Sequence, residues 1–309
     1  MQLRIIHQTS YHYDPPVVMA QHLAHLTPPS LPGQVVLAHA VAITPEGTEP
    51  SFSVDAFGNQ RCFFMLQAPH AALSVTADSL VSTEPPRPLP DSPSWEEVRE
   101  WLTYRAGATY DPAAEFTFAS PFVPRHTGFA DFARDLFTPD TPVLACAQAL
   151  MTRVHTDLTY EGGSTAINTP ALEALAQRKG VCQDFAHIMI GCLRSLGLPA
   201  RYVSGYLLTH PPEGQPRLIG ADASHAWVQV HAPGVGWVDF DPTNNHCGQD
   251  RPSEEYVTLA LGRDFGDVSP LRGVIQGGGN PVLKVSVTVA PPDELAALQG
   301  ESAADTPSQ

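Results

Sequence analysis

A proline-rich stretch, EPPRPLPDSPSW, interrupts the chain early and limits how the rest of it can fold. It holds five prolines in twelve residues. Each proline lacks a backbone N–H and has a fixed φ angle, so this stretch suits neither a helix interior nor a central strand. We therefore expect residues 84–94 to form a stiff, extended linker. The linker divides the 309 residues into an N-terminal domain, 1–83, and a larger domain, 95–290.

The two sides of the linker have different hydrophobic patterns. Residues 1–83 contain alternating runs such as LRIIHQTSYHY and short apolar runs such as RCFFMLQAP, which indicate strands. The segment DAFGNQ lies between two runs and is typical of a hairpin connection. Helical patterns follow in 95–197, and strand-like alternation returns in 198–290. We predict an α+β protein with a β-rich N-terminal domain and a second domain that is helical first and mainly β afterwards, followed by a disordered tail, 291–309.

Local signals mark the ends of the expected helices. Ser94 and Glu97 have the spacing of a capping box, which predicts that a helix begins there. Pro142 suits the first position of a second helix. A third helix is expected to end at Gly180, directly before a fourth that begins around Cys182.

The charge balance argues against several classes of partner. Seventeen basic and 32 acidic residues leave a formal net charge of −15. Nucleic acid and anionic lipid are bound through Lys and Arg, so neither is expected as a partner. The N-terminus has no apolar signal-peptide core, and no run is long enough to span a membrane. The five cysteines are irregularly spaced, so we expect a cytoplasmic protein without a disulfide framework.

The cysteine in GVCQDFAH, Cys182, stands at the predicted start of a helix. Unpaired N–H groups and the helix dipole stabilise a thiolate at such a position. A buried structural thiol is the alternative, because free cysteine is among the most buried residue types. Cys192, in the middle of the same predicted helix, fits that alternative well.

The stretch SHAWVQVHAPGVGWVDFDPT supplies candidate partners for the thiol. His225 opens one predicted strand, and Asp241 closes the next. Their even-numbered neighbours are small or apolar, so His225 and Asp241 share the opposite face. A three-residue loop at Ala232–Gly234 would place the two directly opposite each other. An Asp that faces a His can fix the imidazole tautomer, and the His can then hold a thiolate and protonate a leaving group.

Metal binding is the competing chemistry for these side chains. Zinc sites favour closely spaced ligand pairs such as C-x₂-C. The candidate ligands do not form such pairs. They are Cys182, His187, His225, His231, His246 and Cys247. The glycines of GGGN at 277–280 lack the Gly-Lys-Ser/Thr of a phosphate-binding loop. We expect no metal and no organic cofactor.

Three segments together resemble the transglutaminase-like superfamily, which has a papain-like thiol fold. They are GVCQDFAHIMIGCLRSLGLPARYVSGYL, SHAWVQVHAPGVGW and VDFDPTNN, in that order. The segments IHQTSYHYDPPVVMAQHLAHLTP and DAFGNQ are similar to the β-rich N-terminal region of bacterial members. GRDFGDVSPLRGVIQGGG and the alternating strand after it are similar to their C-terminal segment. The resemblance covers about residues 1–290 and implies a helical part carrying the Cys, packed on an antiparallel sheet carrying the His and Asp.

The resemblance also implies roles for individual residues. Cys182 would be the nucleophile, His225 the general base and acid, and Asp241 the residue that orients the histidine. Asp239 competes for that last role, but the aspartate of the family stands directly before Pro-Thr, as Asp241 does. An oxyanion hole would use the Cys182 backbone N–H and an upstream donor. Tyr160, in LTYEGG, is the candidate for that donor or for a substrate contact, and it could equally be an exposed aromatic at a helix–loop junction.

The implied activity is that of a thiol enzyme which cleaves or transfers peptide, isopeptide or glutamine-type amides through a thioester. Water as acceptor gives a peptidase or amidase, whereas an amine gives a transamidase. Animal members depend on calcium, but the chain has no D-x-[DN]-x-[DN]-G loop, so we expect metal-independent activity on a peptide or protein substrate. A non-catalytic interaction module and an acyl-CoA-dependent arylamine acetyltransferase are the alternatives. In the acetyltransferases the cysteine lies much nearer the start of the chain.

Overall fold

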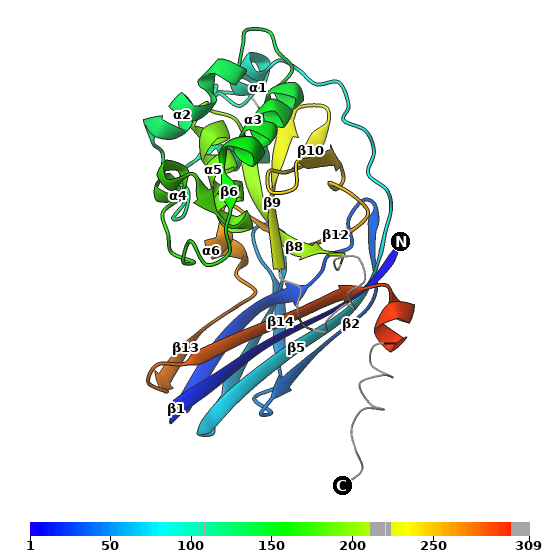
Figure 1. Cartoon of the computed structure of the whole chain (residues 1–309), viewed down its shortest axis with the longest axis vertical. Coiled ribbons are helices and arrows are strands. Elements are labelled where there is room, and N and C mark those ends of the chain that lie inside the picture. The colour runs from blue at the N-terminus through cyan, green and yellow to red at the C-terminus, as the bar shows by residue number, and fades with distance from the viewer. Residues whose placement is uncertain (108, 211–219, 221–223, 298–309) are drawn as a thin grey trace.

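The computed structural model describes residues 1–107, 109–210, 220 and 224–297. Figure 1 shows a part made of helices and a small sheet, packed above a broad sheet of long strands. Residues 84–94 run between the two parts as an extended segment along one side, where the Arg87 backbone pairs with Gln249. None of the described helices is both long and apolar enough to cross a membrane.

The lower, N-terminal sheet is built on one long strand, β1 (Gln2–Thr27). The predicted hairpin at DAFGNQ is confirmed, because it joins two antiparallel strands and Asp55 accepts the N–H groups of Phe57 and Asn59. The other strands of the first 83 residues are β2 (Gln34–Thr44), β3 (Ser51–Val54), β4 (Gln60–Leu66) and β5 (His70–Thr83), in the spatial order β2-β5-β1-β4-β3.

Two C-terminal strands also belong to this sheet. Strands β13 (Leu271–Gly277) and β14 (Val282–Ala290) both pair antiparallel with β1. The expectation that the whole of 95–290 forms one separate domain is therefore wrong for 271–290. The alternation of these segments predicts strands, but it carries no information on their partner. An uncovered edge on the long β1 would leave unpaired backbone groups and apolar side chains in water, and β13 and β14 cover it.

The expected disordered tail is also partly ordered. Residues 292–297 are helical, and Leu295 is fully buried. The rest of that tail, 298–309, lies outside the described residues.

The upper part is a five-stranded antiparallel sheet with helices against one face. The prediction that even-numbered residues face the core is confirmed, since Val228, Val230 and Phe240 pack in one apolar cluster with Ile188 and Met189. The strands, in spatial order, are β11 (His246–Gln249), β10 (Gly236–Asp241), β9 (Ser224–Ala232), β8 (Ala200–Leu207) and β12 (Tyr256–Gly262). The helices are α1 (Trp95–Trp101), α2 (Thr127–Ala133), α3 (Val143–Asp157), α4 (Ala171–Gln177), α5 (Cys182–Ser195) and α6 (Phe265–Val268), with 3₁₀ turns at Pro112–Thr117 and Arg134–Leu136.

The expected helix ends agree with the structure to different degrees. The capping box is confirmed: Glu97 N–H donates to Ser94 Oγ at 3.3 Å, and Ser94 N–H donates to Glu97 Oε2 at 2.8 Å. Pro142 precedes the first residue of α3 and so stands at the cap. The third helix, α4, does not reach Gly180, because Arg178 turns the chain with φ 56°. Gly180 lies instead in the short strand β7 (Lys179–Gly180), which pairs with β6 (Thr159–Tyr160).

The two sheets are fastened to each other along an apolar seam. Apolar side chains of the N-terminal sheet are buried against β8 and β12 in one cluster. The N-terminal sheet contributes Leu3, Ile5, Val287 and Val289, and the upper part contributes Tyr206, Leu208, Val257 and Leu259. Asn59 adds polar contacts, since its amide accepts the Leu261 N–H at 2.8 Å and donates to the Leu261 carbonyl at 2.7 Å. The seam therefore fixes where the N-terminal sheet stands relative to the upper sheet.

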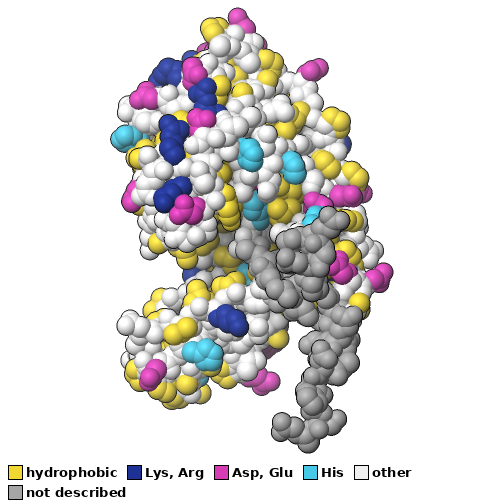
Figure 2. Space-filling view, in the orientation of Figure 1, with side chains coloured by type: hydrophobic (Ala, Val, Ile, Leu, Met, Phe, Trp, Pro, Cys, Tyr) yellow, Lys and Arg dark blue, Asp and Glu magenta, His cyan; other side chains and the backbone are white. Residues whose placement is uncertain are grey.

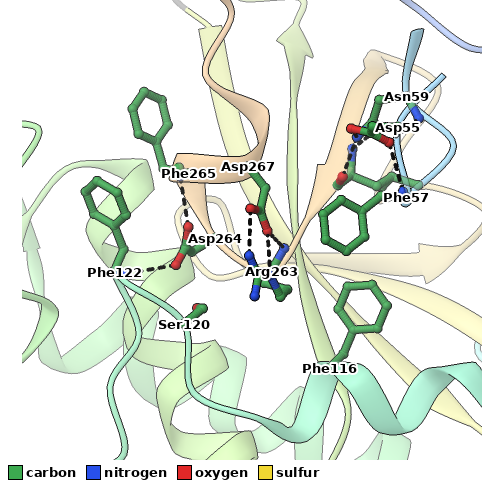
Figure 3. A network of polar contacts seen from close by, with 12 residues as sticks. Asp55, Phe57, Asn59, Phe116, Ser120, Phe122, Arg263, Asp264, Phe265 and Asp267 are labelled. Atoms are coloured by element: carbon green, nitrogen blue, oxygen red, sulfur yellow. Dashed lines mark hydrogen bonds and ion pairs between the residues drawn. The ribbon is translucent and has the colours of Figure 1, made fainter. Parts of the chain in front are cut away.

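A buried arginine joins several segments around the C-terminal half of α5. Arg194 is only 2% exposed, and its guanidinium donates to the carbonyls of Phe116, Ala200 and Arg263 and to Ser120 Oγ at 2.7–3.1 Å. Figure 3 shows Phe116, Ser120 and Phe122 along one segment of the chain, facing Arg263 and Asp264 of another. The arginine thus ties the 112–123 segment to the sheet and to the start of α6.

Replacing this arginine should cost much more stability than replacing an exposed one. We expect Arg194→Met to lower the free energy of unfolding by about 3 kcal/mol or more, because several buried acceptors lose their donor. The matched control is Arg4→Met, which removes a half-exposed ion pair with Asp78 and should change stability by less than about 1 kcal/mol. Urea unfolding followed by circular dichroism measures both. Equal effects of the two substitutions would contradict the structural role of Arg194.

Candidate active site

The site begins at the first turn of α5. Cys182 is the first residue of this helix and is half-buried. Asp184 accepts the Val181 N–H at 2.8 Å and the Thr165 hydroxyl at 2.6 Å, and it is almost fully buried. A side chain at Gly180 would collide with Asp184, whose Cβ lies 2.7 Å from the place of the missing Cβ. Asp184 therefore holds the turn that carries Cys182, which agrees with a structural role for this residue.

A histidine and an aspartate from neighbouring strands face the same end of the sheet. His225, the second residue of β9, is bonded through Nε2 to Oδ2 of Asp241, the last residue of β10, at 2.8 Å. Their side chains are 10% and 0% exposed, respectively. Cys182 lies near enough to His225 to help raise the pKa of the imidazole. Because Nε2 faces Asp241, Nδ1 is the ring nitrogen left for the thiol. The structure thus brings together all three residues of the proposed triad.

The pairing register of β9 and β10 differs from the expected one. His231 pairs with Trp237 and Val228 pairs with Phe240, so Asp241 lies diagonally from His225 and not directly opposite. The loop spans residues 233–235, because Ala232 is fully buried and stays in β9 while Gly236 turns the chain with φ 93°. A shift of two residues keeps every side chain on its face, and diagonal neighbours remain within reach.

Three further groups hold Asp241 in place. The Tyr256 hydroxyl donates to its Oδ2 at 2.6 Å, the Asn244 amide donates to the same oxygen at 2.7 Å, and the Thr243 N–H donates to Oδ1 at 2.8 Å. Neither Asn244 nor Tyr256 was among the predicted site residues. Asn244 stands three residues after Asp241 in VDFDPTNN, so a local turn could have indicated it. Tyr256 comes from β12, and no local signal shows its contact.

Asp239 occupies a different environment from Asp241. It is fully buried, and it accepts hydrogen bonds from Trp227 Nε1 at 2.6 Å and from the Gln229 amide at 2.9 Å. Burial raises the pKa of Asp239 to about 6, although these donors partly oppose the shift. The carboxylate that reaches His225 is that of Asp241.

The triad residues shift each other's ionisation. Burial alone would lower the pKa of His225, but the hydrogen bond to Asp241 and the nearby Cys182 thiol outweigh it and raise this pKa to about 10. Burial alone would raise the pKa of Asp241, but the contacts with His225, Tyr256 and Asn244 lower it overall. The site therefore favours an imidazolium between a carboxylate and the thiol at neutral pH.

Tyr160 lies on the same side of the site as the thiol. Its partner in the parallel pair of β6 and β7 is Gly180, two residues before Cys182. Its side chain is 57% exposed and meets the ring of Phe185 edge-on. Burial and the nearby Cys182 thiol both raise the pKa of Tyr160, so its hydroxyl stays protonated and able to donate.

The remaining cysteines are placed differently. Cys62, Cys146 and Cys192 are buried, Cys247 is half-buried, and burial raises the pKa of all four thiols. Cys192, in the middle of α5, is thus a structural thiol, as its position suggested. Within the parts of the chain that the structure describes, no three His, Cys, Asp or Glu side chains are grouped so that they could hold a metal ion.

Comparison with known proteins identifies the family. The model of the transglutaminase-like superfamily matches residues 130–242, which include Cys182, His225 and Asp241, and that of the bacterial transglutaminase-like N-terminal region matches residues 3–82. An uncharacterized protein of Mycobacterium tuberculosis is 39% identical over 298 residues, which cover 93% of this chain and 92% of the relative. The chain belongs to the transglutaminase-like superfamily.

Two further similarities extend this result. The crystal structure of a candidate cysteine protease from Cytophaga hutchinsonii has a TM-score of 0.71 at 20% identity, covers 94% of this chain and 90% of its own, and so shows the same fold. A protein-glutamine gamma-glutamyltransferase of Pseudomonas aeruginosa is 40% identical over 67 residues, which are 21% of this chain and 10% of that protein. The predicted papain-like, transglutaminase-like fold is confirmed. Its family and its fold are those of cysteine-type enzymes.

Proposed function

We propose that this protein is a thiol acyl-transfer enzyme that acts on peptide, isopeptide or glutamine-type amides. One observation carries the proposal: His225 is bonded at 2.8 Å to the buried Asp241, and Cys182, at the start of α5, lies near enough to help raise the pKa of His225. A nucleophile, a base and an orienting group in hydrogen-bond reach of one another are the parts that covalent acyl transfer requires.

The first half-reaction forms a thioester. The Cys182 thiolate attacks the carbonyl carbon of the amide, and a C–S bond forms while the carbonyl oxygen becomes an oxyanion. The free N–H groups of the first turn of α5, with the Tyr160 hydroxyl as a second donor, would stabilise that oxygen. The His225 imidazolium then gives its proton to the amide nitrogen, the C–N bond breaks, and the amine leaves.

The second half-reaction returns the free enzyme. Neutral His225 takes a proton from water or from an acceptor amine, which attacks the thioester carbon. The C–S bond breaks, and the thiolate is restored beside the imidazolium. Asp241, which is held by Tyr256 and Asn244, keeps the ring oriented through both steps. Water gives hydrolysis and an amine gives transamidation. The masses of the products with and without an added primary amine distinguish the two reactions.

Thiol labelling provides a direct test of the nucleophile. With limiting iodoacetamide at pH 7, Cys182 should react at least about tenfold faster than Cys247, because Cys182 stands beside His225 at a helix start, whereas burial raises the pKa of the Cys247 thiol. Cys247 is the matched control, since it is also half-buried. His225→Ala should slow the labelling of Cys182 and leave that of Cys247 unchanged.

Trapping of the acyl-enzyme completes the test. Intact-mass analysis after incubation with a library of peptides and glutamine donors should show adducts on the wild type and none on Cys182→Ala. Equal labelling of Cys182 and Cys247, together with no adduct from any peptide, would refute the proposal and favour a non-catalytic interaction module.

A further inference from the structure

A cavity of about 240 Å³ lies where the N-terminal sheet meets the upper part of the molecule. Its walls come from β1 and β14 on one side and from Ile167, Gln183, Ser224 and Phe265 on the other. Figure 1 shows β9 running down toward the broad sheet that contains β14, and Figure 2 shows a waist between the two parts. Gln183 follows Cys182, and Ser224 precedes His225. The cavity is thus one residue away from each of these two triad members.

The wall formed by the N-terminal sheet is a continuation of the apolar seam. On β14, Val287 and Val289 are fully buried by the upper part, whereas Val285 and Leu283 on the same face are 49% and 47% exposed. Tyr11 of β1 pairs with Leu283 and adds its ring to this wall. The seam therefore ends at this cavity and leaves its last apolar residues open to it.

The cavity offers no partner for a charge. None of the described residues that line it is Lys, Arg, Asp or Glu. Its one histidine, His7, is 1% exposed and bonded to the Tyr206 hydroxyl at 2.9 Å, and burial lowers the pKa of His7 to about 4, so it is neutral near pH 7. The Gln183 amide already donates to the Ile167 carbonyl at 2.9 Å. A charged group that entered would lose its hydration without compensation.

We propose that this cavity is the subsite for an uncharged, apolar side chain of the acyl-donor peptide, next to the amide that Cys182 attacks. Its volume is below the roughly 300–1,000 Å³ of sites for whole small ligands, so it suits a single side chain. The proposal rests on the proposed function and gives the N-terminal sheet a part in substrate selection. It makes Leu283 and Val285 specificity-determining residues.

Peptide binding to an inactive variant tests the subsite. In a Cys182→Ala background, fluorescein-labelled Gly-Gly-Leu-Gln-Gly-Gly should bind at least about tenfold more tightly than the same peptide with Glu in place of Leu, by fluorescence anisotropy. Adding Leu283→Asp should remove this preference. Val282→Asp is the matched control, because Val282 is 66% exposed on the opposite face of β14, and it should keep the preference. Leu283→Gln should weaken the preference with less risk to folding.

The labelling experiment separates failure of the subsite from failure of the function. On the wild-type thiol, Leu283→Asp should leave the rate of Cys182 alkylation unchanged, because the substituted side chain is not part of the triad. Selective alkylation of Cys182, combined with a Leu-over-Glu preference that survives both Leu283→Asp and Leu283→Gln, would overturn the subsite and leave the proposed function standing. Loss of selective alkylation in the wild type would instead defeat the proposed function.

Discussion

Cys182→Ala is expected to reduce turnover by at least about 10⁴-fold, because loss of a nucleophile removes the covalent route and leaves only binding and oxyanion stabilisation. The assay follows release of the amine from the best peptide found by acyl-enzyme trapping. Cys247→Ala is the matched control, since it removes an equally half-buried thiol outside the triad, and it should keep wild-type turnover. Thermal unfolding of both variants checks that the loss of turnover in Cys182→Ala does not come from misfolding.

The double variant Cys182→Ala/His225→Ala sharpens this expectation. Residues that act as one unit are not additive, so the double variant should be no slower than Cys182→Ala alone. A further large drop would show that His225 supports a reaction that does not pass through Cys182. That result would contradict the thioester mechanism.

The sequence was sufficient to predict the contact between His225 and Asp241, because this contact depends on strand parity more than on register. Alternation in β9 and β10 places His225 and Asp241 on one face, and a shift of two residues preserves that placement. The shift itself was not predictable, because it depends on whether Ala232 remains buried in the strand. Likewise, the capping box at Ser94 is a local feature and was predicted correctly.

Contacts between distant segments were the part that could not be predicted. Tyr256 reaches Asp241 from β12, and β14 pairs with a strand at the other end of the chain. Local hydrophobic patterns show that such segments are strands, but pairing partners follow from packing of the whole molecule. The apolar cavity is of this kind, since Leu283 becomes part of the site only because β14 returns to β1.

Asp241→Asn is expected to lower turnover by about 10⁴-fold while the fold persists, because an amide does not stabilise the imidazolium as a carboxylate does. The pH profile gives a more specific signature. Asp241 helps to raise the pKa of His225, so the protonated ring survives through neutral pH and activity is lost only as the pH rises through that raised value. Without the carboxylate, burial acts in the opposite direction, and the alkaline limb of the profile should move to lower pH.

Asp239→Asn is the matched control for this substitution, since Asp239 is equally buried on the same strand but bonds to Trp227 and Gln229. The pKa of Asp239 is raised to about 6, above its usual value near 4. Between these two pH values the folded state therefore binds more protons than the unfolded state, and the protein loses stability as the pH rises from about 4 to about 6. Asp239→Asn should remove that pH dependence of stability and leave the alkaline limb of activity where the wild type has it. If Asp239→Asn moved the limb and Asp241→Asn did not, the orienting role would belong to Asp239.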